Sequence, residues 1–565
     1  MTNDKENCDN QLDEAEILAQ KILASQPNNP DALNGLGLIL MHRQRFGHAV
    51  KYFRRAVDVD GDNLDSRRNL VRALIAIAKV SSEAGEYDDA IATLRSAIII
   101  SPDQLDPVCH LSFVFSQSGR HNEALSTADK ALGLDSEHPH PHDVKGLALI
   151  ELGRTKEALG SFRRAIEIDP NFTSAYNNLG IGLMNLKEHE AAIKQFECVL
   201  QIDSQDAQAY NNLGLAFADT ANFVEAEAAL VKAIEIAPDY AEAHFNHSRI
   251  LLMCGNYEEG WRENEWRWRC SSFPSTWRNF PYPQWRGESV TGKTVLVWSE
   301  QGIGDEIMFA NPIPDLLADG AKLVLECGER LVPLFARSFQ AATVVARCDP
   351  PDKKIRQAQI DYQTPMASLC SYYRNTRESF HGGSGSYLTA GPIRKSELRA
   401  RYVALGDEPV IGICWRSGNP IAGPERSASL DLWDGILLQP NCSFVSLQYG
   451  EVEEDLASVK ERLGVKVYRD TDVKPLENAE DWFAQVAAMD LVISIDNSTI
   501  QVSGSQGIPT WTLLSYLPEW RFGFKGREHD WHSSIRVYRQ PSTGDWQSVF
   551  SEVIPDFADW LHSST

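Results

Sequence analysis

Apolar and small residues recur in the first half of the chain at a spacing of 34 positions, with seven extra residues near 64–70. One column of this repeat holds only alanine, at Ala49, Ala90, Ala124, Ala158, Ala192 and Ala226. A second column, four residues later, reads Phe53, Leu94, Ala128, Phe162, Phe196 and Leu230. Residues three and four apart share one face of an α-helix, so each repeat predicts a helix with an apolar stripe. A proline or another turn former follows at 61, 102, 136, 170, 204 and 238, and ends that helix.

This pattern predicts a stack of helix–turn–helix units, and its spacing resembles that of tetratricopeptide repeats. We predict a polar N-terminus with a partial repeat over 1–29 and a superhelix over 30–260. The full units are 30–63, 64–104, 105–138, 139–172, 173–206 and 207–240, and a closing unit begins at 241. Because seven residues make two helical turns, the insertion should lengthen one helix without breaking the stack.

Three asparagines occupy one column on the first helices of three units: Asn178, Asn212 and Asn246. The first helices of such a superhelix line its concave face, where amides can hydrogen-bond an extended peptide backbone. The array resembles that of protein O-GlcNAc transferases, in which an asparagine ladder holds the protein substrate. This resemblance implies a protein or peptide partner in the groove. The alternative is that asparagine is simply tolerated on a solvated helix face.

Tryptophan and arginine alternate in the segment 261–290, with five tryptophans between Trp261 and Trp285. Aromatic and basic residues mixed in this way can bind single-stranded nucleic acid. The net charge of −24 opposes that role, so no nucleic-acid partner is expected. We predict instead a junction in which the indoles close the solenoid, contact the next domain and carry stacked arginines.

From Thr294 onward, short β-rich runs alternate with helical stretches, and the overall fold class is α plus α/β. The predicted strands are TVLVW (294–298), KLVLEC (322–327), TVVAR (343–347), PVIGICW (409–415), SFVSLQY (443–449), KVYRD (466–470), LVISID (491–496) and PTWTLLS (509–515). We predict two doubly wound, Rossmann-like lobes separated by a cleft. The N-terminal lobe covers 291–395, the C-terminal lobe 396–550, and a final helix or tail 551–565.

Polar groups gather at the predicted strand ends, where ligands bind in such folds. They are Gly302–Asp305, Arg416–Asn419, Gln448–Glu451 and Asp496–Thr499. Each alone is consistent with a turn or a helix cap. Together they suit displacement of a diphosphate. The helix that starts after Asp496 would receive phosphate oxygens, and Arg416 or Arg426 would neutralise the developing charge. Asp305 on the other lobe would act as base through its position.

The segment from about 294 to 550 resembles bacterial GT-B glycosyltransferases related to heptosyltransferases (glycosyltransferase family 9), specifically members with N-terminal tetratricopeptide repeats. The matching stretches are EQGIGDEIMFA (300–310), IGICWRSGNP (411–420), RSASL (426–430), SLQYGE (446–451), DLVISIDNSTIQVSGSQGIP (490–509) and PEWRFG…HDWHSSIRVYRQPSTGDW (518–546). The resemblance implies an inverting transfer from a nucleotide-diphosphate sugar, with no metal or other cofactor, and makes Asp305 the catalytic residue. The donor-binding set is Gly302, Gly304, Arg416, Arg426, Glu451, Asp496, Asn497, Ser498, Thr499, Gln501 and Gly504.

One position departs from the family pattern, because Gln501 stands where the family carries a histidine. Glutamine can donate a hydrogen bond to phosphate but carries no charge. The departure leaves an alternative open, in which the chain is a repeat scaffold with an inactive transferase domain. A further alternative keeps the enzyme but gives it a glycan or lipid-linked acceptor.

The cysteines, the N-terminus and the hydropathy of the chain bear on the cellular compartment of the protein. The ten cysteines include no C-x-x-C pair, which is typical of reduced thiols in a cytoplasmic protein. The acidic N-terminus is unlike a signal peptide, and no run approaches 18 apolar residues, so no membrane span is expected. Asp470-Thr471-Asp472 matches the D-x-D of metal-dependent glycosyltransferases, but a turn after a strand explains it as well, and no metal site is predicted.

Overall fold

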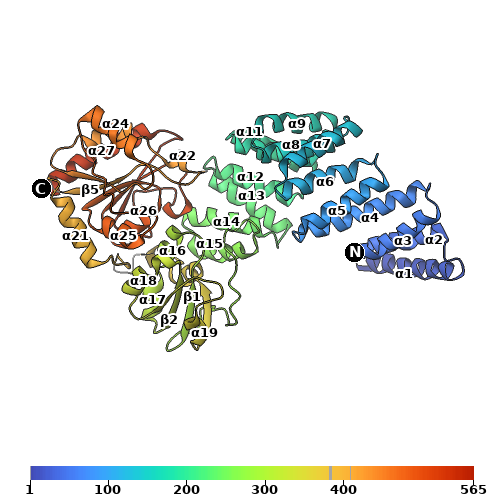
Figure 1. Ribbon diagram of the computed structural model, residues 1–565, viewed down its shortest axis with the longest axis horizontal. Coiled ribbons are helices and arrows are strands. Elements are labelled where there is room, and N and C mark those ends of the chain that lie inside the picture. The colour runs from blue at the N-terminus through green and yellow to red at the C-terminus, as the bar shows by residue number, and fades with distance from the viewer. Residues whose placement is uncertain (1, 381–384, 407–408, 421, 565) are drawn as a thin grey trace. The chain divides into compact units, whose positions relative to one another are not determined.

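The computed structural model describes residues 2–380, 385–406, 409–420 and 422–564 (Figure 1). The chain forms two compact units, Met1–Thr220 and Ala221–Thr565. We refer to them as the first and second compact units.

The first compact unit is a succession of helices, each packed against the next (Figure 1). They are α1 (Thr2–Ser25), α2 (Pro30–His42), α3 (Phe46–Val59), α4 (Leu64–Glu83), α5 (Tyr87–Ile100), α6 (Leu105–Gln117), α7 (His121–Leu134), α8 (Pro139–Glu151), α9 (Thr155–Ile168), α10 (Thr173–Asn185), α11 (His189–Ile202) and α12 (Ala207–Ala218). The predicted apolar stripe is confirmed, because the residues of both columns in this unit are fully buried.

The seven-residue insertion lies in α4, as predicted. This helix has 20 residues, whereas α2, α6, α8 and α10 have 13 each. It still packs against α3 and α5. Two added helical turns therefore extend one helix and keep the stack continuous.

Glycines on the first helices of several repeats make room for the aromatic column. A Cβ atom added to Gly180 would lie 2.4 Å from the ring of Phe196, and one added to Gly37 would lie 2.4 Å from the ring of Phe53. No side chain fits at that distance. Close approach of the paired helices thus explains why glycine stands at these two positions.

The second compact unit begins with α13 (Phe223–Ile236), α14 (Ala241–Cys254) and α15 (Tyr257–Asn264). The division at 220/221 therefore falls inside the predicted superhelix 30–260. The N-terminal α/β lobe follows, with β1 (Thr294–Trp298), α16 (Ile303–Phe309), α17 (Ile313–Ala318), β2 (Lys322–Cys327), α18 (Val332–Ser338), β3 (Thr343–Ala346), α19 (Lys353–Gln357), β4 (Tyr362–Pro365) and α20 (Cys370–Tyr373). Its strands are all parallel, in the order β3-β2-β1-β4.

The C-terminal lobe holds a second all-parallel sheet in the order β6-β5-β7-β8-β9. Its elements are α21 (Pro392–Val403), β5 (Val410–Cys414), α22 (Gly423–Arg426), α23 (Asp434–Leu437), β6 (Ser443–Ser446), α24 (Glu453–Leu463), α25 (Ala479–Ala487), β7 (Leu491–Ile495), α26 (Ser498–Ser505), β8 (Thr510–Leu514), β9 (Ile535–Arg539) and α27 (Trp546–Ser564). Alternate residues of β7 belong to different cores, so both faces of the sheet are covered.

The sheet orders locate the binding edges of the two lobes. The chain leaves β5 for β6 on one side and returns to β7 on the other. Such a reversal of strand order opens a crevice at the carboxyl ends of the strands. In the first sheet the same reversal separates β1 from β4. The loops that follow β1, β5 and β7 therefore lie where a ligand is expected.

One predicted strand is wrong, and two strands were missed. KVYRD forms no strand, and only Tyr468 pairs, through a single bridge to Val445. The strands β4 and β9 were not predicted, because neither is a continuous apolar run. In β4 the polar Gln363 is buried and accepts a hydrogen bond from the Trp298 indole at 2.6 Å.

The tryptophan-rich junction packs as predicted inside the second compact unit. Trp261 is buried and lies edge-on against Phe309 and Trp520, which come from the two lobes. The stacked arginines are present as well, with the Arg269 guanidinium 4.4 Å from the Trp266 ring centre.

Candidate functional site

A cavity of about 640 Å³ lies in the second compact unit, at the loops that follow β1 and β7. The N-terminal lobe contributes Gly302, Ile303, Gly304, Asp305 and Phe309, with Gln301 beside them. The C-terminal lobe contributes Ser417, Asn419, Arg426, Tyr449, Asp496, Asn497, Ser498, Gln501, Glu519, Trp520 and Arg521. The helices α14 and α15 and the junction complete the wall with Phe245, Arg249, Leu252, Asn264 and Pro274.

Asp305 caps a helix and also contacts the opposite lobe. It lies in the first turn of α16, and one of its oxygens accepts a hydrogen bond from the Gly302 amide at 3.2 Å. Its other oxygen lies 3.0 Å from a terminal nitrogen of Arg521, which belongs to the C-terminal lobe. The carboxylate is therefore a helix cap that also faces the opposite lobe across the cavity.

The neighbouring carboxylate, Glu306, points elsewhere. It is buried and accepts a hydrogen bond from the Gly328 amide at 2.8 Å. Burial raises its pKa to about 7. It does not line the cavity, so Asp305 is the acidic residue of this loop that a ligand would meet.

Charges of opposite sign alternate along the C-terminal wall. The Arg426 guanidinium contacts Glu519 and lies 3.5 Å from an oxygen of Asp496. Burial raises the pKa of Asp496 to about 6, against the opposing effect of Arg426. Burial would also raise the pKa of Glu519, but Arg521, Arg426 and Arg249 outweigh it and lower the pKa to about 2. Glu519 is thus ionised throughout the neutral range, whereas Asp496 takes up a proton in mildly acidic solution.

The cavity is nearly balanced in charge although the chain carries −24. Its charged lining residues are three guanidinium groups and three carboxyl groups: Arg249, Arg426, Arg521, Asp305, Asp496 and Glu519. One oxygen of Asp496 and the Nε of Arg521 are buried without a hydrogen-bond partner. Buried polar atoms normally have partners. The unpaired oxygen of Asp496 is the one that lies 3.5 Å from Arg426.

The loop after β7 starts α26 with an asparagine cap. The Asn497 side chain accepts a hydrogen bond from the Thr499 amide at 2.9 Å and lies 2.9 Å from the Cys414 sulfur. Ser498 faces the other lobe, because a Cβ atom on Gly304 would lie 3.4 Å from its hydroxyl. Thr499 is fully buried and does not line the cavity. The N-terminus of α26 therefore meets α16 across the cavity.

Gln501 and Gly504 lie on the next turn of α26. Gln501 lines the cavity, and its side-chain oxygen lies 3.1 Å from the Nε2 of His532. Gly504 does not line the cavity but packs against the same imidazole. Gly504 thus has a packing role in this structure.

Besides Thr499 and Gly504, two further predicted donor-binding residues lie outside the cavity lining. The Arg416 side chain donates to the carbonyl oxygen of Glu451 and lies 3.3 Å from Asp455. Glu451 is exposed. The two residues belong to the loops after β5 and β6, and the Arg416 side chain joins these loops through the backbone of Glu451.

Sequence reasoning missed Glu519 and Arg521, which carry much of the charge in the cavity. Both stand in the matched stretch PEWRFG, but no spacing rule brings that stretch to β1 or β7. It also missed Arg249 and Asn264, because they belong to the helical segment that was assigned to the repeats and the junction. Tertiary packing alone brings these helices to the cavity.

The predicted asparagine row is divided between the two units. In the first compact unit, Asn178 is half-buried and donates to Asp143 at 2.8 Å. Asn212 accepts a hydrogen bond from Asn211 at 3.4 Å, and its amide nitrogen is buried without a partner. Asn246 lies on α14, in the second compact unit. The Asn178 amide is thus already engaged inside its own repeat array.

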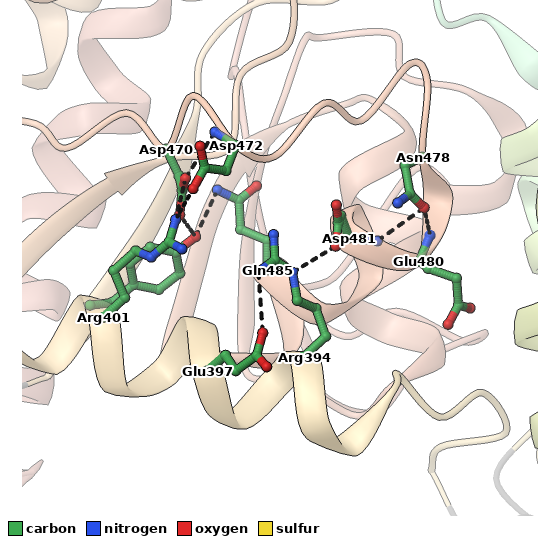
Figure 2. Close-up of polar contacts among 10 residues, drawn as sticks. Arg394, Glu397, Arg401, Asp470, Asp472, Asn478, Glu480, Asp481 and Gln485 are labelled. Atoms are coloured by element: carbon green, nitrogen blue, oxygen red, sulfur yellow. Dashed lines mark hydrogen bonds and ion pairs between the residues drawn. The ribbon is translucent and has the colours of Figure 1, made fainter.

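Asp470 and Asp472, the D-x-D pair, are engaged by helix α21 (Figure 2). Asp470 is buried and accepts hydrogen bonds from Arg401 at 2.8 Å and from the Tyr402 hydroxyl at 2.9 Å. Asp472 lies 2.9 Å from the same guanidinium. These contacts give the pair a structural role, and the described part of the chain holds no group of three or more His, Cys, Asp or Glu arranged for a metal ion.

Comparison with known proteins identifies the N-terminal helices. Family models match residues 146–187 (TPR repeat), 207–240 (tetratricopeptide repeat) and 9–97 (anaphase-promoting complex, cyclosome, subunit 3). The N-terminal region therefore carries tetratricopeptide repeats, as its spacing predicted. No helix in the described ranges is long and apolar enough to cross a membrane.

The chain is also similar to a curated protein and to solved repeat structures. The chain is 31% identical over 338 residues to Protein FlbA of Caulobacter vibrioides, a match that covers 58% of this chain and 56% of that protein. Among solved structures, yeast Tom70 aligns with a TM-score of 0.38 at 15% identity over 47% of this chain and 57% of its own. The repeat protein TTC0263 of Thermus thermophilus aligns with a TM-score of 0.31 at 18% identity, over 32% of this chain and 99% of its own.

Proposed function

We propose that the second compact unit is a glycosyltransferase of the GT-B type, which moves a sugar from a nucleotide-diphosphate donor to an acceptor hydroxyl. The observation that carries this proposal is the placement of Asp305 and the N-terminus of α26 on facing walls of one cavity. A carboxylate on one lobe and a helix N-terminus on the other suit a base and a diphosphate site, respectively.

The reaction is a single displacement with inversion. Asp305 takes the proton of the acceptor hydroxyl while that oxygen bonds to the anomeric carbon. The bond from the anomeric carbon to the diphosphate breaks at the same time, and its electron pair leaves with the diphosphate. The amides at the start of α26, together with Arg426 and Arg521, neutralise this charge.

Arg521 links the two halves of this mechanism. It pairs with Asp305 at 3.0 Å, and burial is outweighed by Asp305, Glu519 and Asp496 in raising its pKa. A carboxylate held by a guanidinium is a poor base. We therefore propose that the donor diphosphate draws Arg521 away from Asp305, so that the base becomes effective only when the donor is bound.

The test uses the full chain and a panel of nucleotide-linked sugars. A donor at 100 times its dissociation constant should stabilise the protein by about 2.7 kcal/mol, which a thermal shift detects. Hydrolysis or transfer should then appear with the donor that binds. Asp305→Asn should lower that rate at least ~100-fold, because the positioned base is lost.

Glu329→Gln is the matched control. It makes the same carboxylate-to-amide change on an exposed residue of the same lobe, away from the cavity. Its rate should stay within about twofold of the wild type. If a donor binds but is not turned over, and Asp305→Asn leaves its binding unchanged, the protein is not a transferase but a binding protein.

We further propose that the repeats recruit a protein, which is the acceptor. The alternative is a scaffold with an inactive transferase domain, and the Arg521–Asp305 ion pair together with Gln501 favours it. Asn178, Asn212 and Asn246 changed together to alanine should weaken transfer to protein and leave donor hydrolysis intact. Equal loss of both activities would mean that these asparagines are not an acceptor site.

We place this activity in the cytoplasm. The cysteines whose surroundings are described, from Cys109 onward, are free thiols. Free thiols of this number are typical of reducing compartments.

A further inference from the structure

We propose that His532 is a positioning residue that orients the Gln501 amide so that its NH₂ group faces the donor diphosphate. The inference rests on the proposed function and assigns a role to a histidine that the mechanism does not otherwise use. It also accounts for the departure at position 501.

The two side chains form an isolated buried pair beneath the cavity. Gln501 is 3% exposed and lines the cavity, and His532 is 1% exposed and lies behind it. The Gln501 Oε1 and the His532 Nε2 are 3.1 Å apart. Among the described residues, neither side chain donates or accepts another hydrogen bond, so each defines the orientation of the other.

His532 is held firmly on its remaining sides. A Cβ atom on Gly504 would lie 2.4 Å from the imidazole, so glycine at this position lets the ring lie directly against α26. Tyr387 stacks on the ring with an interplanar angle of 17°, and His529 stacks on it with an angle of 4°. The His532 amide donates to the Nδ1 of His529 at 3.2 Å. The imidazole therefore has little freedom to rotate.

The position of the ring proton decides which end of the amide faces the cavity. Burial lowers the pKa of His532 to about 3, so the ring is neutral and carries one proton. Its Nδ1 is buried without a hydrogen-bond partner. A buried N–H without an acceptor costs more than a buried lone pair without a donor, so the proton resides on Nε2. Nε2 then donates to Gln501 Oε1, and the NH₂ group of Gln501 remains for the ligand.

The consequence for binding is specific. Gln501 presents a fixed, uncharged donor on the second turn of α26. The imidazole behind it, which would be partly protonated in solution near neutral pH, is kept neutral by burial. The pair thus replaces a cationic contact with a preorganised neutral one, which a loose glutamine would not supply.

The experiment measures binding of inorganic pyrophosphate to the full chain by calorimetry, which requires no turnover. Gln501→Ala should weaken binding about 10-fold or more, because one hydrogen bond to a charged group is lost. His532→Phe keeps the stacked ring and removes the N–H, and we expect a comparable loss. His532→Gln restores a donor at the same reach, so its binding should stay within about threefold of the wild type.

A double-mutant cycle shows whether His532 acts through Gln501. In the Gln501→Ala background, His532→Phe should cause no further loss, because the group that it orients is absent. Additive losses would mean that His532 acts independently and would overturn the inference. Melting temperatures of all variants identify any that fail to fold.

Gln501→Ala and Gln501→Glu test the orientation and do not depend on the His532 variants. If the NH₂ group faces the ligand, Gln501→Ala loses a donor, and Gln501→Glu places a negative charge beside the pyrophosphate and should bind it more weakly still. If instead the amide oxygen faces the ligand, its removal in Gln501→Ala costs no affinity, which overturns the inference. A wild-type chain that binds no pyrophosphate overturns the diphosphate site itself, whereas wild-type binding that His532→Phe leaves unchanged overturns the inference alone.

Discussion

The two compact units bury charge very differently. Among the side chains that the structure describes, the first compact unit has one fully buried Asp, Glu, Lys or Arg, which is Asp143. The second compact unit buries Arg267, Glu300, Glu306, Glu326, Arg374, Asp470 and Asp496. The first unit is held by a repeated apolar surface, and the second combines apolar cores with individual charge pairs.

This difference shows where specific function is expected. In the repeats, each alanine and phenylalanine stripe packs only against the neighbouring repeats. No repeat needs a particular partner from a distant part of the chain. A buried charge is tolerated only when a partner and hydrogen bonds accompany it. Buried charges therefore mark places where distant segments must meet in one arrangement, as they do at the cavity.

The largest expected effect concerns the Arg267–Glu300 pair in the second compact unit. Both residues are fully buried, and two nitrogens of Arg267 lie 2.8 Å from the two oxygens of Glu300. Arg267→Met should destabilise this unit by about 3–5 kcal/mol, because it leaves a buried carboxylate without its partner. Scanning calorimetry measures the effect. Arg262→Met, on an exposed arginine of the same segment, should cost at most about 1 kcal/mol.

The next effect is a pH-dependent change in the stability of the second compact unit, caused by Asp496. The pKa of Asp496 is raised from 3.8 to about 6, so the folded state binds this proton more tightly than the unfolded state does. Its contribution is fully present below about pH 4 and is lost as the pH rises through 6. The loss amounts to about 2–3 kcal/mol, since one pKa unit corresponds to about 1.4 kcal/mol.

Asp496→Asn removes this titration. Relative to the wild type, the variant should gain about 2–3 kcal/mol of stability between about pH 4 and about pH 7, as measured by denaturant unfolding. Asp472→Asn, on the exposed partner of Arg401, is the control. A constant difference between Asp496→Asn and the wild type across this range would show that Asp496 does not titrate there.

A smaller effect tests the close helix approach in the first compact unit. Gly180→Ala places a Cβ atom 2.4 Å from the Phe196 ring, so we expect a loss of about 1–3 kcal/mol. Gly160→Ala is the matched control, because no atom lies within 4 Å of its added Cβ. That variant should be more stable by about 0.5–1 kcal/mol, since alanine favours the helix. Equal effects of both variants would contradict the packing argument.

The smallest effect concerns Asp143, the one charged side chain buried among the described residues of the first compact unit. Burial raises its pKa, and Asn178 and Ser174 each donate a hydrogen bond to it at 2.8 Å. Asn178→Ala should cost about 1 kcal/mol, because one of these donors is lost. Asn171→Ala, on an exposed residue two positions before α10, should be nearly neutral. If Asn178→Ala does not change the stability, the hydrogen bond to Asp143 is unimportant for folding, and Asn178 could serve in the groove instead.

Much of the fold was predictable because its signals are local or periodic. The 34-residue spacing placed each helix pair, and the seven-residue insertion placed the long helix α4. Continuous apolar runs predicted β1, β2 and β7 within one residue. β9 was missed because it alternates apolar and basic residues, and KVYRD was wrongly assigned because a short apolar run does not ensure a strand partner.

The candidate site was predictable only in part. Asp305 and Asp496 follow strands, so the strand-end rule identified them, and both line the cavity. Arg416 and Glu451 also follow strands, but neither lines the cavity, and the Arg416 side chain donates to the Glu451 carbonyl oxygen instead. The rule predicts that a residue lies at the binding edge of the sheet. It does not predict where the side chain points, because that depends on the groups packed around it.

The amino-acid sequence by itself determined the periodic helices and the positions of most strands, because burial patterns along the chain encode them. Only the tertiary structure decided that Arg521 meets Asp305, that His532 lies behind Gln501, and that α14 and α15 belong to the cavity wall. Those contacts join segments far apart in the chain, and their energies depend on burial and on charge partners that no local pattern records. The physical reason is that periodicity reports which face of an element is apolar, whereas a site depends on which charged and polar groups face one another across a cavity.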